Sequence, residues 1–405
     1  MDLKKIRADF PMFENNPELI YLDNAATTFK PWPVIRKLEE FYTLKSVNIH
    51  RGEYDLSFKV SEEYDQTREK VADFLNCQSR EVVFTYGASA SLNLVAFGYG
   101  RKILKPGDVI LTTEAEHASG ILPWFKVAEM TGATIRYIPQ GSDGQIDLKD
   151  YEACLDKKVK VVAIAQVSNV LGYHLPIQEM AALAHQVGAV ISVDGAQSVP
   201  HMKTDFLGWD LDFLSFSSHK MCGPGGVGVL AGKYELLQKT DPYFYGGGAN
   251  ARFYVDGSIE LQEVPLRFET GTPPIGEVLA LGAAVDYLSD LGMDNIQKAE
   301  YELRQYAGAK LAALDNVIFY NPNAQAGILT FNVKGVFSQD AASYLNTRHI
   351  AVRSGNHCAK ILDQIIGVGD TVRASLYFYN TKEEIDRFIE AVADTSLKSS
   401  LDFLF

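Results

Sequence analysis

The chain has 405 residues, of which 47% are hydrophobic and 22% are charged, and its formal net charge is −13. This composition is typical of a globular protein, and the acidic balance disfavours nonspecific binding to nucleic acid. No apolar run reaches the roughly 18 residues of a membrane span, and the basic start has no apolar segment after it, so a cytoplasmic location is expected. Four widely spaced cysteines, none in a C-x-x-C pair, argue against a disulfide framework or a zinc cluster.

Apolar strands alternate with helices through the middle of the chain. Strand patterns cover 108–114, 133–139, 159–168, 189–197 and 210–218. A helical stretch follows "EHASG", and a second helix covers 176–188, with Pro at its start and Gly at its end. Near-continuous apolar strands between helices predict an α/β fold with a mostly parallel sheet that is covered on both faces.

The last third of the chain has a different pattern. A long helix is predicted over 276–292, a strand over 326–333, and a closing helix from Thr381, with Glu384 placed for a capping box. Because single cores stop growing at about 250–300 residues, two domains are expected. The predicted division is a large α/β domain at 22–280 and a smaller α+β domain made of 1–21 and 281–405.

Small and polar residues stand at the ends of the strands, where the ligands of open α/β sheets bind. In chain order they are Gly87, Ala88 and Ser89; Glu116 and His117; Ser168 and Asn169; Asp194 and Gln197; and Ser217, His219 and Lys220. An amine at a buried strand end is costly unless the site uses it. Lys220 could bind the aldehyde of pyridoxal phosphate, and Asp194 could face the pyridine nitrogen. The segment "GASASLNLVA" offers backbone N–H groups at a helix start for a phosphate.

Each of these features has an ordinary explanation when taken alone. A lysine after a strand is most often a solvated surface residue, and an Asp-Gly pair is usually a turn. "GASAS" is also no P-loop, because it lacks the Lys-Ser/Thr ending. The order of the groups at successive strand ends nevertheless favours the cofactor site.

The sequence resembles the pyridoxal-phosphate enzymes of fold type I in the class-V aminotransferase group, and more closely the group II (SufS/CsdA-type) cysteine desulfurases. The similar segments include "YLDNAATT" (21–28), "NIHRGEYDLS" (48–57), "FTYGASASLNLVA" (84–96), "VDGAQSVPH" (193–201), "FLSFSSHKMCGPGGVGVL" (213–230), "RFETGTPP" (267–274) and "RSGNHC" (353–358). The resemblance implies a fold type I transferase: a large domain with a mostly parallel, seven-stranded-type sheet between helices, and a smaller α+β domain.

The resemblance also implies roles for individual residues. It gives Lys220 as the Schiff-base lysine, Asp194 at the pyridine nitrogen, Gln197 at the ring hydroxyl, His117 stacked on the ring, and Asn169 near the ring hydroxyl or the substrate. It places Ala88, by its backbone N–H, with Ser89, Ser217 and His219 at the phosphate. In such enzymes the threonine of the "GTP" element reaches the phosphate from a second subunit; here this is Thr272, which implies a homodimer.

Cys358 is the candidate nucleophile. It lies in the polar loop "RSGNHCAK", whereas a structural cysteine more often lies in an apolar run. A loop thiol near cationic groups can be held as the nucleophilic thiolate. Cys222 is the rival, two residues from Lys220, although packing in a tight turn is the simpler account for it. Cys77 and Cys154 have the surroundings of structural cysteines.

Arg373 and Arg353 are the candidate substrate-binding residues. A guanidinium grips a carboxylate with two hydrogen bonds, as an amino-acid substrate requires, although the common fate of an arginine is a surface salt bridge. The resemblance places Arg373 at the substrate carboxylate and Arg353 close to the substrate and the nucleophile.

The activity implied by the resemblance is conversion of L-cysteine to L-alanine. Lys220 would take the α-proton, His117 is a candidate proton carrier, and the sulfur would pass to Cys358 as a persulfide. A sulfur-acceptor protein (SufE- or SufU-like) would then collect it for iron–sulfur cluster assembly or other sulfur transfer. The alternatives are a selenocysteine lyase or cysteine-sulfinate desulfinase on the same scaffold, an aminotransferase, and a binding or sulfur-relay protein without turnover.

Three segments depart from the family pattern. Ala88 stands where a hydroxyl residue is common, "EAEHASG" surrounds His117 in place of the usual "EHHSN", and "CAKILDQ" follows Cys358 without the common proline-leucine pair.

Overall fold

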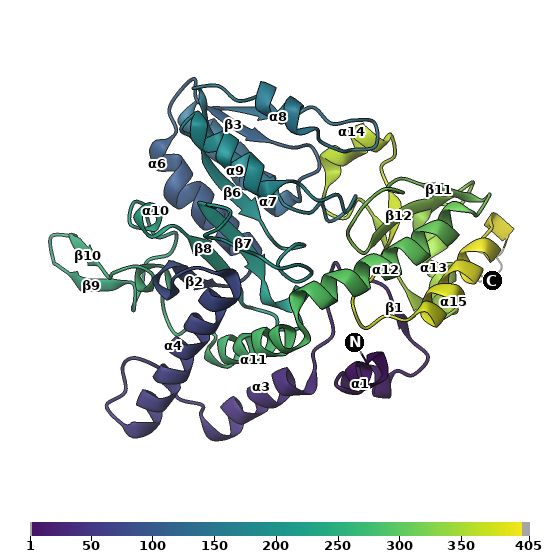
Figure 1. Cartoon of the computed structure of the whole chain (residues 1–405). Helices are drawn as coiled ribbons and strands as arrows, with labels where there is room; N and C mark the ends of the chain where they lie inside the picture. Colours follow the sequence, from purple (N-terminus) through teal and green to yellow (C-terminus); the bar gives the residue numbers. More distant parts are fainter. Residues whose placement is uncertain (1, 399–405) are drawn as a thin grey trace.

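The computed structural model of the chain describes residues 2–398, and its centre is a seven-stranded sheet in the order β2-β8-β7-β6-β5-β3-β4 (Figure 1). The strands are β2 (Val82–Thr85), β3 (Val109–Thr112), β4 (Thr134–Tyr137), β5 (Val159–Ala165), β6 (Val190–Asp194), β7 (Phe213–Ser217) and β8 (Gly228–Gly232). β8 pairs antiparallel with both β2 and β7, and the other pairs in this sheet are parallel. The predicted α/β fold with a mostly parallel sheet is therefore confirmed.

Helices cover both faces of this sheet. Along β2 and β3, alternate residues enter two separate core clusters: Val82 and Val109 pack on one side, Val83 and Ile110 on the other. The first side is covered by α3 (Trp32–Leu44), α4 (Asp55–Leu75), α8 (Leu148–Ala153), α9 (Ile177–Gln186) and α11 (Ile275–Leu291). The second is covered by the π-helix η2 (Leu94–Gly100), α6 (Arg101–Ile103), α7 (Ala118–Thr131) and α10 (Tyr234–Leu237). The helix α5 (Ala88–Asn93), which leads into η2, contacts β7 and β8. Because alternate residues of a strand are buried on opposite faces of the sheet, nearly every residue of these strands is apolar.

A second, four-stranded antiparallel sheet has the order β11-β12-β15-β14. Its strands are β11 (Val317–Phe319), β12 (Ile328–Val333), β14 (Arg353–Gly355) and β15 (Thr371–Ser375), and it packs with α12 (Met293–Ala312), α13 (Ser338–Thr347) and α15 (Lys382–Asp394). It has its own core, which includes Phe331 and Phe388. The predicted closing helix is α15: Thr381 is its N-cap, and Glu384 completes the capping box.

The N-terminal segment contains α1 (Leu3–Ala8) and α2 (Pro11–Asn15), and it reaches the second sheet region through β1 (Ile20–Tyr21), which pairs in parallel with β13 (Ile350–Ala351). Ile6 and Phe10, by contrast, pack in the core of the large sheet. The division at residues 22–280 remains a prediction, and residues 399–405 of the predicted smaller domain lie outside the described part.

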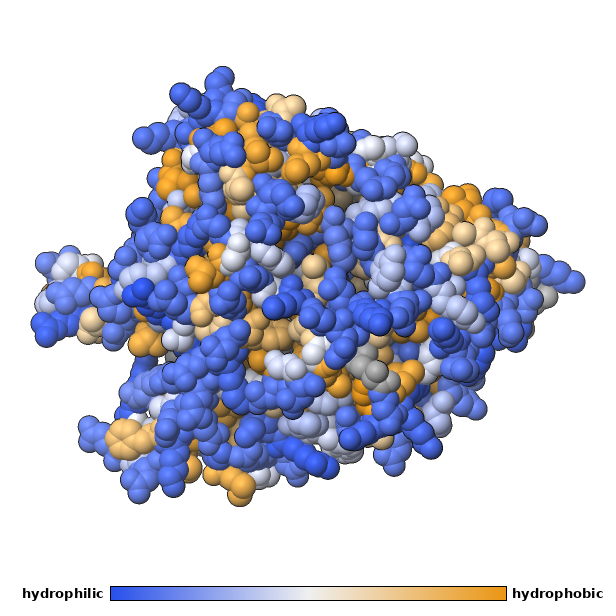
Figure 2. Space-filling view, in the orientation of Figure 1, coloured by the Kyte–Doolittle hydropathy of each residue, from blue (hydrophilic) through white to orange (hydrophobic). Residues whose placement is uncertain are grey.

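A two-stranded arm, β9 (Asn250–Phe253) and β10 (Ile259–Leu261), projects from the body at the left of Figures 1 and 2. It carries large exposed apolar side chains, among them Phe253 and Ile259. Single helical turns complete the fold: η1 (Ser79–Glu81), η3 (Ser218–Lys220), η4 (Leu266–Phe268), η5 (Lys360–Leu362) and α14 (Asp363–Ile366). Within residues 2–398, no helix has the length and apolar character needed to cross a membrane.

Candidate active site

The ends of β5, β6 and β7 open into one pocket, and Arg353 and Arg373 line it from strands of the smaller sheet. Most of the predicted site residues line it: Ala88, Ser89, His117, Asn169, Asp194, Gln197, Ser217, His219, Lys220, Arg353 and Arg373. Thr272 and Cys358 do not line it. The polar residues expected at successive strand ends therefore lie together in one pocket, although they are far apart in the sequence.

Lys220 ends the η3 turn directly after β7, is half-buried, and lines the pocket. Burial lowers the pKa of Lys220 to about 8; Asp194 acts in the opposite direction, and Arg373 and Arg353 lower the pKa further. A lysine with a pKa near 8 has a substantial neutral fraction at physiological pH. It can therefore act as a nucleophile or as a base.

The start of α5 forms the polar end of the pocket. Gly87 caps this helix with a φ of 143°, and the Ala88 N–H donates to Ser217 Oγ at 2.7 Å. Ser89 Oγ lies 2.7 Å from Ser119 Oγ. Backbone N–H groups and hydroxyls at a helix start are the donors that a phosphate requires.

His219 and His117, which both line the pocket, are held neutral at pH 7. Burial lowers the pKa of His219 to about 4, helped by Lys220 and Lys30. Burial also lowers the pKa of His117, against the effect of Asp194. His117 is the N-cap of α7, and its Nδ1 accepts from the Ser119 N–H at 3.1 Å. The neutral ring therefore carries its proton on Nε2.

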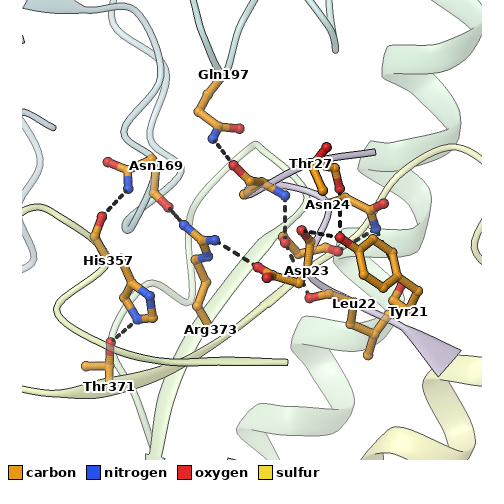
Figure 3. Close-up of polar contacts among 12 residues, drawn as sticks. Tyr21, Leu22, Asp23, Asn24, Thr27, Asn169, Gln197, His357, Thr371 and Arg373 are labelled. Carbon is orange, nitrogen blue, oxygen red and sulfur yellow. Dashed lines mark hydrogen bonds and ion pairs between the residues drawn. The ribbon is translucent and has the colours of Figure 1, made fainter. Parts of the chain in front are cut away.

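Arg373 lies on β15, and its side chain is fully buried. Figure 3 shows its polar contacts. One terminal nitrogen donates to the Asn169 carbonyl at 2.9 Å, and the other pairs with Asp23 Oδ1 at 3.0 Å. Its Nε has no hydrogen-bond partner among the described residues. Arg353 on β14 is the register partner of Arg373, so two guanidinium groups approach the pocket from adjacent strands. This arrangement suits a carboxylate.

Cys358 is exposed just outside the pocket, and its loop is tied to the pocket residues by backbone hydrogen bonds. The Cys358 carbonyl accepts from the Ala118 N–H at 2.7 Å. The His357 carbonyl accepts from Asn169 Nδ2 at 2.9 Å (Figure 3). His357 and Cys358 both have left-handed φ values, 51° and 62°. Two successive non-glycine residues in this region are costly and persist only where the surroundings enforce them.

Sequence reasoning missed two residues of the site, Asp23 and His357. Asp23 lies in the quoted segment "YLDNAATT", but nothing local indicates its ion pair with Arg373, 350 positions away. His357 lines the pocket; its Nε2 is 2.9 Å from Thr371 Oγ1, and its Nδ1 has no partner among the described residues. Burial, with Arg373 and Arg353, lowers its pKa to about 3.

The residues fit pyridoxal phosphate at both ends. Asp194 and Lys220 lie in the same pocket as the α5 cradle, and Gln197 lies on the wall beside Asp194, with its amide donating to the Ala25 carbonyl at 2.7 Å. Together the fold and the pocket define a pyridoxal-phosphate-dependent enzyme of fold type I.

Comparison with known proteins gives the same class. The profile of the family described as "Aminotransferase class-V" matches residues 20–388. A protein of Halalkalibacterium halodurans named "Probable cysteine desulfurase" is 44% identical over 98% of this chain and 98% of its own. The apo structure of a cysteine desulfurase from Thermococcus onnurineus has a TM-score of 0.92 and 38% identity, covering 96% of this chain and 97% of its own. The cysteine desulfurase CsdA from Escherichia coli has a TM-score of 0.91 and 34% identity, covering 100% and 99%. The chain belongs to the class-V aminotransferase family and, within it, to the cysteine desulfurases.

Proposed function

We propose that this protein converts L-cysteine to L-alanine and receives the sulfur on Cys358 as a persulfide. The observation that carries the proposal is the attachment of the Cys358 loop. Its backbone is hydrogen-bonded to Ala118, next to His117, and to Asn169 on the pocket wall, while the residue itself is exposed. A thiol so placed can face a substrate in the pocket and afterwards a partner in solution.

The substrate carboxylate binds at Arg373, with Arg353 beside it. Arg373 is fully buried, so its positive charge needs a counter-ion, and Asp23 supplies one in this structure. The Nε of Arg373, which has no hydrogen-bond partner within the described part of the chain, is a further donor for an incoming carboxylate. An arginine of this kind also fixes which side of the amino acid faces Lys220.

When bound, pyridoxal phosphate supplies an aldehyde that holds the amino group and a ring that withdraws electrons from Cα. Asp194, on the pocket wall, would hold the proton of the pyridine nitrogen. The Lys220 amine, with its pKa lowered to about 8, accepts the Cα proton and can return it. His117 presents an Nε2–H donor to the pocket.

The sulfur step is a displacement at the substrate sulfur. The Cys358 thiolate forms an S–S bond as the bond between the substrate Cβ and its sulfur breaks, and Cβ takes a proton. Cysteine plus a protein thiol thus gives alanine plus a protein persulfide. No outside oxidant or reductant is needed.

The test is to incubate the purified protein with pyridoxal phosphate and L-cysteine. Alanine should appear, and intact-protein and peptide mass spectrometry should locate one added sulfur atom on Cys358. Lys220→Ala is the control and should give neither product. Alanine formed without sulfur on Cys358 would contradict the proposal, and a much higher rate with L-selenocysteine or cysteine sulfinate would identify the alternative activity on the same scaffold.

We also propose that the working form is a homodimer in which Thr272 reaches the phosphate of the other subunit's site. Thr272 is exposed and outside its own pocket, and the neighbouring surface carries large exposed apolar side chains, namely Tyr243, Phe244, Tyr245 and Phe253. Patches of this kind mark protein contacts. A mixed dimer of Thr272→Ala and Lys220→Ala chains should regain activity that neither parent has, because one site then has both groups. A cis role for Thr272 predicts no gain.

The persulfide then passes to a sulfur-acceptor protein (SufE- or SufU-like), for iron–sulfur cluster assembly or other sulfur transfer. The exposure of Cys358 supports this step. All four cysteines are free, which suits a reducing compartment, so we place the protein in the cytoplasm.

A further inference from the structure

Glu116 is a buried carboxyl for which the proposed reaction has no use. It lies in the turn between β3 and α7, next to His117, and only 5% of its surface is exposed. Its Oε1 accepts from Thr113 Oγ1 at 2.7 Å, and its Oε2 accepts from the Ala165 N–H, at the end of β5, at 2.9 Å. These contacts fix the carboxyl in one place below the pocket.

Gly120, in the first turn of α7, leaves a space that Glu116 shares with Asp194. A Cβ at position 120 would lie 3.4 Å from Glu116 Oε2 and 3.8 Å from Asp194 Oδ2. Asp194 is also buried, and its other oxygen accepts from the Ala196 N–H at 2.9 Å. Two buried carboxyls therefore face the same small volume. The negative charge of Asp194 therefore acts on the ionisation of Glu116.

The surroundings favour the neutral form of Glu116 at pH 7. Burial raises the pKa of Glu116 to about 8, the hydrogen bonds from Thr113 and Ala165 lower it, and Asp194 raises it. The charged and titratable groups that face Asp194 are His117 from the start of α7 and Lys220 from the end of β7. Arg353 and Arg373, from the smaller sheet, act in turn on both of these groups.

We propose that Glu116 is a positioning residue that acts through Asp194: its ionisation sets how much negative charge this carboxyl pair presents to the cofactor nitrogen. The proposal rests on the proposed function, in which that nitrogen lies at Asp194. Glu116 is neutral at pH 7 and ionised above pH 8, so the pair carries one more negative charge in alkaline solution. That added charge stabilises the protonated forms of the cofactor ring and of its link to Lys220.

The experiment is a pH titration, from pH 6 to 10, of the near-visible absorption of the cofactor-bound protein. In Glu116→Gln the amide keeps the shape and can still contact Thr113 and Ala165, but it cannot ionise. The midpoint of the absorbance change should fall by about one pH unit relative to wild type. The affinity for pyridoxal phosphate should be similar in both proteins at pH 7, and wild type should bind more tightly at pH 9.

Two further variants separate charge from structure. Gly120→Ala places a methyl in ordinary van der Waals contact with both carboxyls and excludes water there, so the contribution of Glu116 should move to higher pH. Glu300→Gln is the matched control: Glu300 is a buried glutamate of α12 with a raised pKa, paired with His201 at 2.8 Å, and the titration should not change.

The outcomes also separate this proposal from the proposed function. If wild type binds no cofactor and shows no near-visible band, the proposed function fails. If wild type binds the cofactor normally and Glu116→Gln gives the same midpoint and the same affinity ratio at both pH values, the role of Glu116 is overturned. Equal losses at every pH in Glu116→Gln and Glu116→Ala would show a purely structural role and would also overturn it.

Discussion

Cys222 and Cys358 share a rare backbone conformation but have opposite surroundings. Their φ values are 64° and 62°. Cys222 is completely buried two residues after Lys220; its N–H donates to Thr28 Oγ1 at 2.9 Å, and its Sγ lies 4.0 Å from the Tyr377 hydroxyl. Cys358 is exposed, and its loop is held by the backbone.

Closeness to Lys220 in the sequence does not make a cysteine reactive. Burial raises the pKa of the Cys222 thiol to about 12, so it stays protonated and packs as a small apolar side chain. At Cys358 the left-handed backbone and the bonds to Ala118 and Asn169 orient the loop and leave the side chain unburied. The same backbone conformation therefore accompanies a side chain packed in the core at Cys222 and a side chain exposed to solvent at Cys358.

Removing each thiol in turn tests most directly whether Cys358, and not Cys222, is the nucleophile. Cys358→Ala should lower the rate of alanine formation from L-cysteine by about three orders of magnitude or more, because the step loses its nucleophile. Cys222→Ala should stay within a few-fold of wild type. Both rates are measured with cofactor occupancy checked by absorbance. A comparable loss in a correctly folded Cys222→Ala protein would reverse the assignment.

Chemical modification compares the reactivity of the two thiols in the unmutated protein. In the native protein, iodoacetamide should modify Cys358 at least about 100-fold faster than Cys222, since the buried thiol is both inaccessible and protonated. Peptide mass spectrometry over a time course measures both rates. In guanidinium chloride the two rates should become similar. Equal rates in the native state would mean that the Cys222 turn opens readily.

The bond from Asn169 to the Cys358 loop should have a smaller effect. Asn169→Ala removes one hydrogen bond, to the His357 carbonyl, worth about 1 kcal/mol, so the loop amides around 356–359 should exchange hydrogen about fivefold faster. Asn332→Ala is the matched control: its Nδ2 also donates to a backbone carbonyl, that of Asp370. Unchanged exchange in Asn169→Ala would show that the other bonds of the loop, from Ala118 to the Cys358 carbonyl and between His357 and Thr371, are enough to hold it.

The sequence predicted the part of the site that depends on strand order. Lys220 and Asp194 follow strands whose apolar patterns are local, and parallel strands bring their ends to one edge, so their meeting was foreseeable. The strand expected over 159–168 ends at Ala165, because the following residues form a turn in which Val167 bridges to His174.

The contacts of the second sheet could not be predicted in this way. The ion pair between Asp23 and Arg373 depends on the bridge from Asp23 to Ser375, and the bond from Asn169 to His357 spans 188 positions. No local period encodes such contacts. The coupling of Glu116 to Asp194 likewise appears only when α7 and β6 are placed together around Gly120.

The smallest expected effect is a change in how stability depends on pH. It involves two histidines, His357 directly before Cys358 and His219 directly before Lys220. Their pKa values are lowered to about 3 and about 4, chiefly by burial, whereas in the unfolded chain a histidine titrates near about 6.5. The unfolded state therefore binds more protons below that pH. Stability that is complete above about 6.5 should be lost progressively as the pH falls toward 4.

His357→Gln should make the fall of the melting temperature between pH 7 and pH 4.5 less steep, because one fewer proton is taken up on unfolding. His349→Asn is the control: this histidine is exposed, and asparagine tolerates its φ of 60°. The slope of that variant should match wild type. If the melting temperature of His357→Gln falls with pH as steeply as that of wild type, the His357 imidazole must gain a proton while the protein is still folded. That would require the Cys358 loop to open locally while the core around Cys222 stays folded.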